Sequence, residues 1–193
     1  MFGKVEKVLL QNRAIYDEIV SGAADEKRRS ALIRKLIRTQ KRDGFWYGIK
    51  PSKCESEMRV DFVYFPTYYA TAAMIYADLN GQGLGRRAQS ALQKGLEAAT
   101  GRNLEGHGFG AVRGQLDALA IYKKAGIYRF IGIYGNYFSI YGKFIDMIHR
   151  ILKNMENALE GGNTVADWQF DFKELYEAEL AEYRQSQVCR ISV

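Results

Sequence analysis

The chain has 193 residues, of which 47% are hydrophobic and 26% are charged, and its formal net charge is +6 at pH 7. This length and composition are typical of a globular protein with one sizeable core, and they exclude an intrinsically disordered chain. Two cysteines are too few for a disulfide framework, and we expect both to be free thiols. Neither a signal peptide nor an apolar stretch of membrane-spanning length is evident. We therefore expect a cytoplasmic protein without a membrane partner.

Two prolines and many alanine, leucine, lysine, arginine and glutamate residues predict an all-α protein. The hydrophobic periodicity predicts about seven helices in a single α-helical domain that spans residues 1–193. In chain order, these helices are 3–20, 27–41, 66–79, 85–100, 112–125, 136–159 and 171–186. Pro66 suits a first helical turn, and Gly81 and Gly126 predict helix ends. Residues 47–65 form a long connection, of a kind that is often functional.

The second predicted helix ends in a turn that contains Gln40, Gly44 and Trp46. Leu32 and Leu36 lie on the apolar face of this helix, and Gln40 continues their row by one more turn. The amide of Gln40 therefore points inward, where it can hydrogen-bond the free backbone groups of a neighbouring helix end beneath the indole. Gly44 supplies a left-handed conformation that stops the helix. This pattern predicts a structural joint between helices.

Two segments of the chain resemble one another and indicate an internal repeat. Residues 72–76, followed by Gly81, correspond to residues 118–122, followed by Gly126. The repeated unit is a helix, a turn containing glycine and an aromatic residue, and a second helix. Repeated helical hairpins that bury a shared face form either a solenoid or a closed α/α ring.

The spacing of Gln40, Gly44 and Trp46 resembles the Gln-Trp motif of terpenoid cyclases. Together with the hairpins, it resembles the α/α toroid that these cyclases share with protein prenyltransferase β subunits and several polysaccharide-cleaving enzymes. The resemblance covers roughly residues 27–126 and implies a partial toroid, which is either a half-ring or closes with another chain. The Asp-x-Asp-Asp motif and the zinc-site Asp-x-Cys motif of these families are absent from the sequence. We therefore expect neither a cofactor nor a metal.

Aromatic residues are abundant, with 13 tyrosines, 10 phenylalanines and 2 tryptophans. The resemblance implies that the inner helices present such rings to a central cavity, where they contact sugar faces or an isoprenoid chain. Each tyrosine hydroxyl needs a polar partner, so this composition favours a wet concave surface. The residues expected to bind ligand in this aromatic groove are Trp46, Asp61, Tyr68, Tyr69, His107 and Tyr122.

These patterns favour a non-catalytic or accessory toroid-like module that binds a carbohydrate, an isoprenoid-like molecule or a protein. Self-association or a partner chain would cover the open edge of a partial ring. The alternative is a toroid-type enzyme acting on a saccharide or a lipid. Its acid and base groups would come from Asp43, Asp61, Glu105 and His107.

Two other possibilities, a zinc site and a general base at His149, are not favoured. Cys54, Asp61 and His107 are chemically suitable zinc ligands, but they lack the spacing of a zinc motif. His149 lies on an apolar helix face, where a hydrogen-bonded core or boundary role is favoured over that of a general base.

A third hypothesis rests on the charge of residues 27–42, which contain no acidic residue. Their basic residues are Lys27, Arg28, Arg29, Arg34, Lys35, Arg38, Lys41 and Arg42. Such a helix can neutralise nucleic-acid phosphates, although no known reader motif surrounds it, and nucleic acid is the least favoured partner. The acidic last helix is a simpler partner, either within the chain or between subunits.

Overall fold

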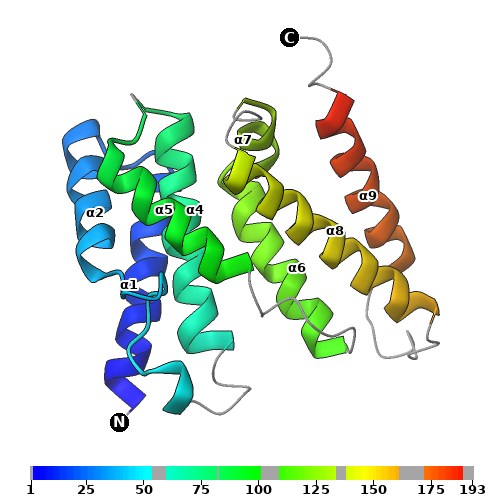
Figure 1. Ribbon diagram of the computed structural model, residues 1–193, viewed down its shortest axis with the longest axis horizontal. Helices are drawn as coiled ribbons and strands as arrows, with labels where there is room; N and C mark the ends of the chain where they lie inside the picture. The colour runs from blue at the N-terminus through cyan, green and yellow to red at the C-terminus, as the bar shows by residue number, and fades with distance from the viewer. Residues whose placement is uncertain are drawn as a thin grey trace. The chain divides into compact units, whose positions relative to one another are not determined.

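The computed structural model describes residues 2–53, 60–81, 83–100, 109–133, 138–160 and 172–188. These residues form eight α-helices and no β-strand, which confirms the expected all-α fold (Figure 1). The helices are α1 (Phe2–Val20), α2 (Glu26–Thr39), α4 (Phe65–Leu79), α5 (Arg86–Thr100), α6 (Phe109–Lys124), α7 (Ile127–Ile133), α8 (Phe138–Glu160) and α9 (Phe172–Val188). A 3₁₀ turn (Pro51–Lys53) and a π-helical turn (Val60–Tyr64) precede α4.

Each of the seven predicted helices has a counterpart, and α7 is an additional short helix. Pro66 lies in the first turn of α4, as predicted. Gly126 has a φ of 88°, in the left-handed region, and separates α6 from α7. The short apolar run of α7 starts directly after this turn, and a run of this length does not show a helical period by itself.

Within the single predicted domain, the helices form two compact units. Unit 1 contains residues 1–103 and 120–127, and therefore includes α1, α2, α4, α5 and the end of α6. Unit 2 contains residues 104–119 and 128–193, and therefore includes α8, α9 and most of α6. Each unit buries apolar side chains of its own: Ile19, Leu36 and Ile75 in unit 1, and Phe144 and Ile151 in unit 2.

In unit 1, α4 is the central helix and contacts α1, α2 and α5. Its alanines at positions 70, 72 and 73 are fully buried, as are Met74 and Ile75. A helix that is apolar on all sides is stable only where other helices surround it. The α1–α2 and α4–α5 hairpins therefore share one core.

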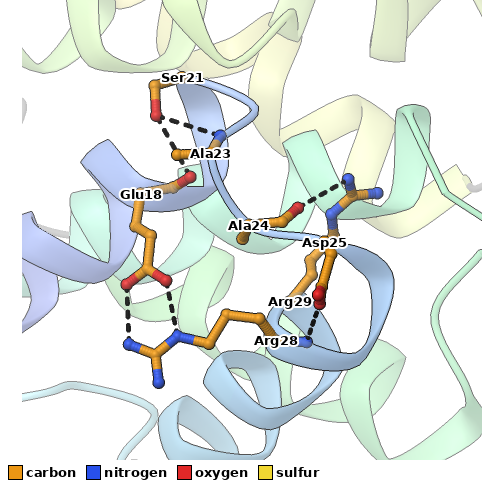
Figure 2. A network of polar contacts seen from close by, with 7 residues as sticks. All are labelled: Glu18, Ser21, Ala23, Ala24, Asp25, Arg28 and Arg29. Atoms are coloured by element: carbon orange, nitrogen blue, oxygen red, sulfur yellow. Dashed lines mark hydrogen bonds and ion pairs between the residues drawn. The ribbon is translucent and has the colours of Figure 1, made fainter.

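The turn between α1 and α2 is fixed by a small polar network (Figure 2). The Asp25 carboxylate accepts a hydrogen bond from the backbone N–H of Arg28 at 2.7 Å and caps α2. The Arg28 guanidinium donates to both carboxylate oxygens of Glu18, at 2.6 and 3.0 Å. These hydrogen bonds lower the pKa of Glu18. The start of α2 is thereby attached to the end of α1.

Candidate functional site

The turn after α2 joins this helix to α5. The Gln40 side-chain amide donates to the carbonyl of Ala91, in α5, at 2.8 Å and to the carbonyl of Gly44 at 3.0 Å. The predicted inward amide is therefore present, and its partner is a carbonyl inside α5. The helix ends at Thr39, before Gly44, whose φ of 89° belongs to the turn that follows.

Trp46 lies in the core of this joint, with an exposed fraction of 0%. Its indole N–H donates to the Leu36 carbonyl at 2.9 Å, and its backbone N–H donates to the Thr67 hydroxyl at 3.1 Å. A Cβ atom added to Gly95 would lie 2.8 Å from Cζ3 of the Trp46 ring. The indole therefore packs closely on the backbone of α5.

Tyr68 and Tyr122 are also core residues, with exposed fractions of 2% and 0%. Their rings make an edge-to-face contact with centroids 5.9 Å apart. The Tyr122 hydroxyl lies 2.7 Å from the Thr71 hydroxyl, and burial raises the pKa of Tyr122. The hydroxyl therefore finds its partner within the protein and needs no wet surface.

The sequence predicts that these rings line an exposed aromatic groove, and at three positions this prediction is wrong. Trp46, Tyr68 and Tyr122 fill the core of unit 1 and do not form an exposed wall. Tyr69 is half-buried, and its ring centroid lies 5.2 Å from that of Tyr16. The aromatic side chains of this region thus contact one another.

The remaining predicted site residues are not brought together among the described residues. The Asp61 side chain, Cys54, Glu105 and His107 lie outside the described part of the structure. Asp43 is exposed, and its carboxylate accepts a hydrogen bond from the Tyr47 hydroxyl at 3.0 Å. In the described ranges, no group of three or more histidine, cysteine, aspartate or glutamate residues is arranged to hold a metal ion.

In unit 2, His149 forms the kind of boundary contact that the sequence predicts. The imidazole lies at the surface, and Nε2 is 2.8 Å from the Tyr183 hydroxyl. The two rings also make an edge-to-face contact, with centroids 5.3 Å apart. His149 is therefore a hydrogen-bonded residue at the boundary of unit 2.

Replacing Tyr122 with phenylalanine is expected to lower the free energy of unfolding by about 1 kcal/mol, the typical net value of one buried hydrogen bond. The loss is small because the Thr71 hydroxyl still donates to the Thr67 carbonyl at 2.8 Å. Urea unfolding followed by circular dichroism measures the change. A loss several times larger would show that the Tyr122 hydroxyl makes further stabilising interactions besides the hydrogen bond with Thr71.

A different feature of unit 1 is suited to ligand binding: a groove of about 720 Å³ between α2 and the start of α5. We call it the arginine groove. Its arginines are Arg29, Arg34 and Arg38 from α2, and Arg86 and Arg87 from the first turn of α5. Its apolar lining residues are Ile33, Ile37, Ala77, Leu84 and Ala88. The apolar side chains are buried or half-buried, whereas all of these arginines except Arg29 are exposed, so the groove has an apolar floor and a cationic rim.

The positive charge of the arginine groove is not neutralised by the acidic side chains that the structure describes around it. Among its described lining residues, Glu26 is the one acidic residue. In the same part of the chain, no ion pair joins Arg34, Arg38, Arg86 or Arg87 to a carboxylate. With respect to the described residues, these four guanidinium groups are therefore available to an external anion.

The first turn of α5 adds to this positive charge. It contains Arg86 and Arg87 and no acidic residue. The backbone N–H groups at a helix start carry a partial positive charge, so arginine there disfavours the helix by about 0.3–1 kcal/mol per residue. Residues that disfavour the local helix are expected at functional sites, where binding requires their side chains.

Arg29 has a different role, because it fixes the wall of the groove. Its guanidinium donates to the Asn80 carbonyl at 3.0 Å and to the Ala24 carbonyl at 3.4 Å (Figure 2 shows the second contact). The backbone N–H of Leu84 donates to the Asp78 carboxylate at 2.7 Å. These contacts hold α2, the end of α4 and the start of α5 in a fixed arrangement.

The fold and the groove define an all-α protein built from helical hairpins with a cationic, apolar-floored groove. Comparisons with protein-family models, with curated proteins and with solved structures found no match for this chain. In the part of the chain that the structure describes, no helix has the length and apolarity needed to cross a membrane.

The basic residues of α2 are predicted from the sequence as a candidate site, but Arg86 and Arg87 are not. Their signal is present in the sequence as two adjacent arginines after a glycine, at a helix start where acidic residues are favoured. What the sequence does not show is that α5 packs beside α2.

Proposed function

We propose that this chain is a non-catalytic binding module whose ligand is an anion with an apolar part, held in the arginine groove. One observation carries the proposal: exposed arginines from two helices line one apolar floor, and none of Arg34, Arg38, Arg86 and Arg87 is ion-paired within the described part of the chain. The proposal keeps the binding role that the sequence favours and moves it from the aromatic rings to this groove.

The chemistry of the lining supports this ligand class. A planar guanidinium forms paired hydrogen bonds with a carboxylate or a phosphate group. The floor of Ile33, Ile37 and Leu84 favours contact with an apolar group. The volume of about 720 Å³ lies in the range of known ligand sites, which is roughly 300–1,000 Å³.

The resemblance to the α/α toroid contributes a proposed architecture for unit 1. The contacts of Gln40, Gly44 and Trp46 with α5 are those of a joint between successive hairpins. We propose that unit 1 is a toroid-like pair of hairpins, and that the arginine groove lies on its α2–α5 face. A toroid-type enzyme is the second candidate function, and it depends on Asp61 and His107.

A charge-reversal experiment tests the proposed function. The probe is decyl phosphate, with decanol and inorganic phosphate as its separate halves. We expect decyl phosphate to bind better than either half. We expect Arg34→Glu with Arg38→Glu to weaken this binding by at least about 10-fold, because the loss of even one charge-assisted hydrogen bond of about 1.5–3 kcal/mol corresponds to roughly 10- to 160-fold. Titration calorimetry at low and high salt measures the affinity.

The matched control is Lys35→Glu with Arg42→Glu. Both residues are exposed and do not line the groove, and the change in total charge is the same. We expect this control to alter the affinity by less than about threefold, which is the size of long-range electrostatic effects between exposed charges. Equal weakening by the two double variants, or no binding of decyl phosphate, would contradict the proposal.

A further inference from the structure

We infer that the occupant of the arginine groove is an acidic amphipathic helix of a protein partner. This inference rests on the proposed function and specifies its ligand. The apolar lining suits a helix-binding surface: Ile33 and Ile37 are spaced i, i+4 on α2, while Leu84, just before α5, and Ala88, in its first turn, line the groove beside them. A row with the spacing i, i+4 forms a ridge against which a further helix packs.

The length of the groove sets the length of its occupant. The α2 wall runs from Glu26 to Arg38, which corresponds to about 18 Å along an α-helix. A helix of about 12 residues, or three turns, has this length. An occupant of this size presents an apolar stripe of three or four side chains to the floor.

The arginines determine the charge pattern of the partner. Arg34 and Arg38 line the groove from α2, and Arg86 and Arg87 line it from the first turn of α5. The complementary helix therefore carries acidic residues on both sides of its apolar stripe. A carboxylate near the first turn of α5 also interacts favourably with the positive end of that helix.

Two other occupants match the lining less well. Single-stranded nucleic acid binds to grooves in which aromatic side chains stack on the bases, and none of the described residues that line this groove is aromatic. An extended peptide binds by adding a strand to a sheet edge, and the described residues contain no sheet. The helical walls and the arginines from both helices favour a helix.

A peptide series tests the inference on the full chain. The probe is a 14-residue peptide with leucines spaced i, i+3, i+4, i+7 and i+11, flanked by glutamates. Its controls are a scrambled peptide of the same composition and a peptide with lysine in place of glutamate. We expect the acidic amphipathic peptide to bind at least about tenfold more tightly than either control, by fluorescence anisotropy.

Protein variants then locate the peptide. We expect the double variant Arg34→Glu with Arg38→Glu to bind the acidic peptide at least about tenfold more weakly than the original chain does. We expect the same variant to bind the lysine peptide more tightly than the original chain does. Lys35→Glu with Arg42→Glu is the matched control and should leave both affinities nearly unchanged. Circular dichroism verifies that each variant keeps its helix content.

The outcomes separate the inference from the proposed function. If decyl phosphate binds in the groove but the acidic peptide binds no better than its scrambled control, the inference is wrong and the proposed function stands. If neither binds, both are wrong. Tighter binding of a single-stranded oligonucleotide than of the peptide, with a steep dependence on salt, would overturn the inference in favour of nucleic acid.

Discussion

Replacing Gly44 with alanine is expected to lower the free energy of unfolding by about 2–5 kcal/mol. Gly44 has a φ of 89°, and an alanine in the left-handed region costs about 1–2 kcal/mol. The added Cβ atom would also lie 2.4 Å from the Lys94 carbonyl oxygen and 3.3 Å from Cβ of Ala98. Overpacking of a tight contact adds about 1–3 kcal/mol. The main-chain oxygen of α5 cannot move aside as a side chain would, so α2 and α5 must separate.

A matched glycine isolates the contact from the backbone strain. Gly22 has a φ of 75°, and a Cβ atom added there would meet no other atom within 4 Å. Gly22→Ala therefore contributes only the strain, about 1–2 kcal/mol. Urea unfolding of both variants, followed by circular dichroism, measures the difference. Equal losses at the two positions would show that Gly44 does not pack against α5 as the structure indicates.

This joint also holds together the two helices that line the arginine groove. Gln40 and Gly44 hold the end of α2 against α5 through Ala91 and Lys94. The rim arginines of the groove lie on these same two helices. A variant that separates α2 from α5 is therefore expected to weaken ligand binding as well as stability, whereas Gly22→Ala leaves the groove intact.

Local patterns predicted most of the helical structure. The periodicity of apolar residues located the helices, Pro66 marked the start of α4, and Gly126 marked the end of α6. The inward amide of Gln40 followed from its row on α2. These features depend on residues within a few positions of one another, which is the distance over which periodicity and capping act.

Contacts between distant residues were not predictable in the same way. Thr71 satisfies the Tyr122 hydroxyl across 51 positions of sequence, and without this partner the tyrosines were interpreted as a wet surface. Arg34 and Arg86 lie on different hairpins, and their common groove arises only when α2 packs beside α5. A single sequence specifies which residues are apolar or charged, but not which of them meet.

Replacing Trp46 with alanine is expected to lower the free energy of unfolding by about 3–5 kcal/mol, the usual cost of removing a buried aromatic ring. The indole is fully buried, and it packs on Gly95 of α5 together with the Thr71 side chain of α4. Trp46→Phe retains much of this volume and loses the hydrogen bond to the Leu36 carbonyl. That carbonyl still accepts a hydrogen bond from the Gln40 backbone N–H at 3.1 Å, so an intermediate loss is expected.

The matched control for Trp46 is Tyr47→Phe in the same turn. The Tyr47 hydroxyl bonds the exposed carboxylate of Asp43, and its removal is expected to change stability by less than about 0.5 kcal/mol. Chemical unfolding of the three variants gives their order, and calorimetry with decyl phosphate on the same samples tests the groove. Because Trp46 contacts no ligand in our proposal, its alanine variant should lose affinity only to the extent that α2 shifts from α5. A loss of affinity without any loss of stability would indicate that Trp46 contacts the ligand, and would contradict its role as a core residue.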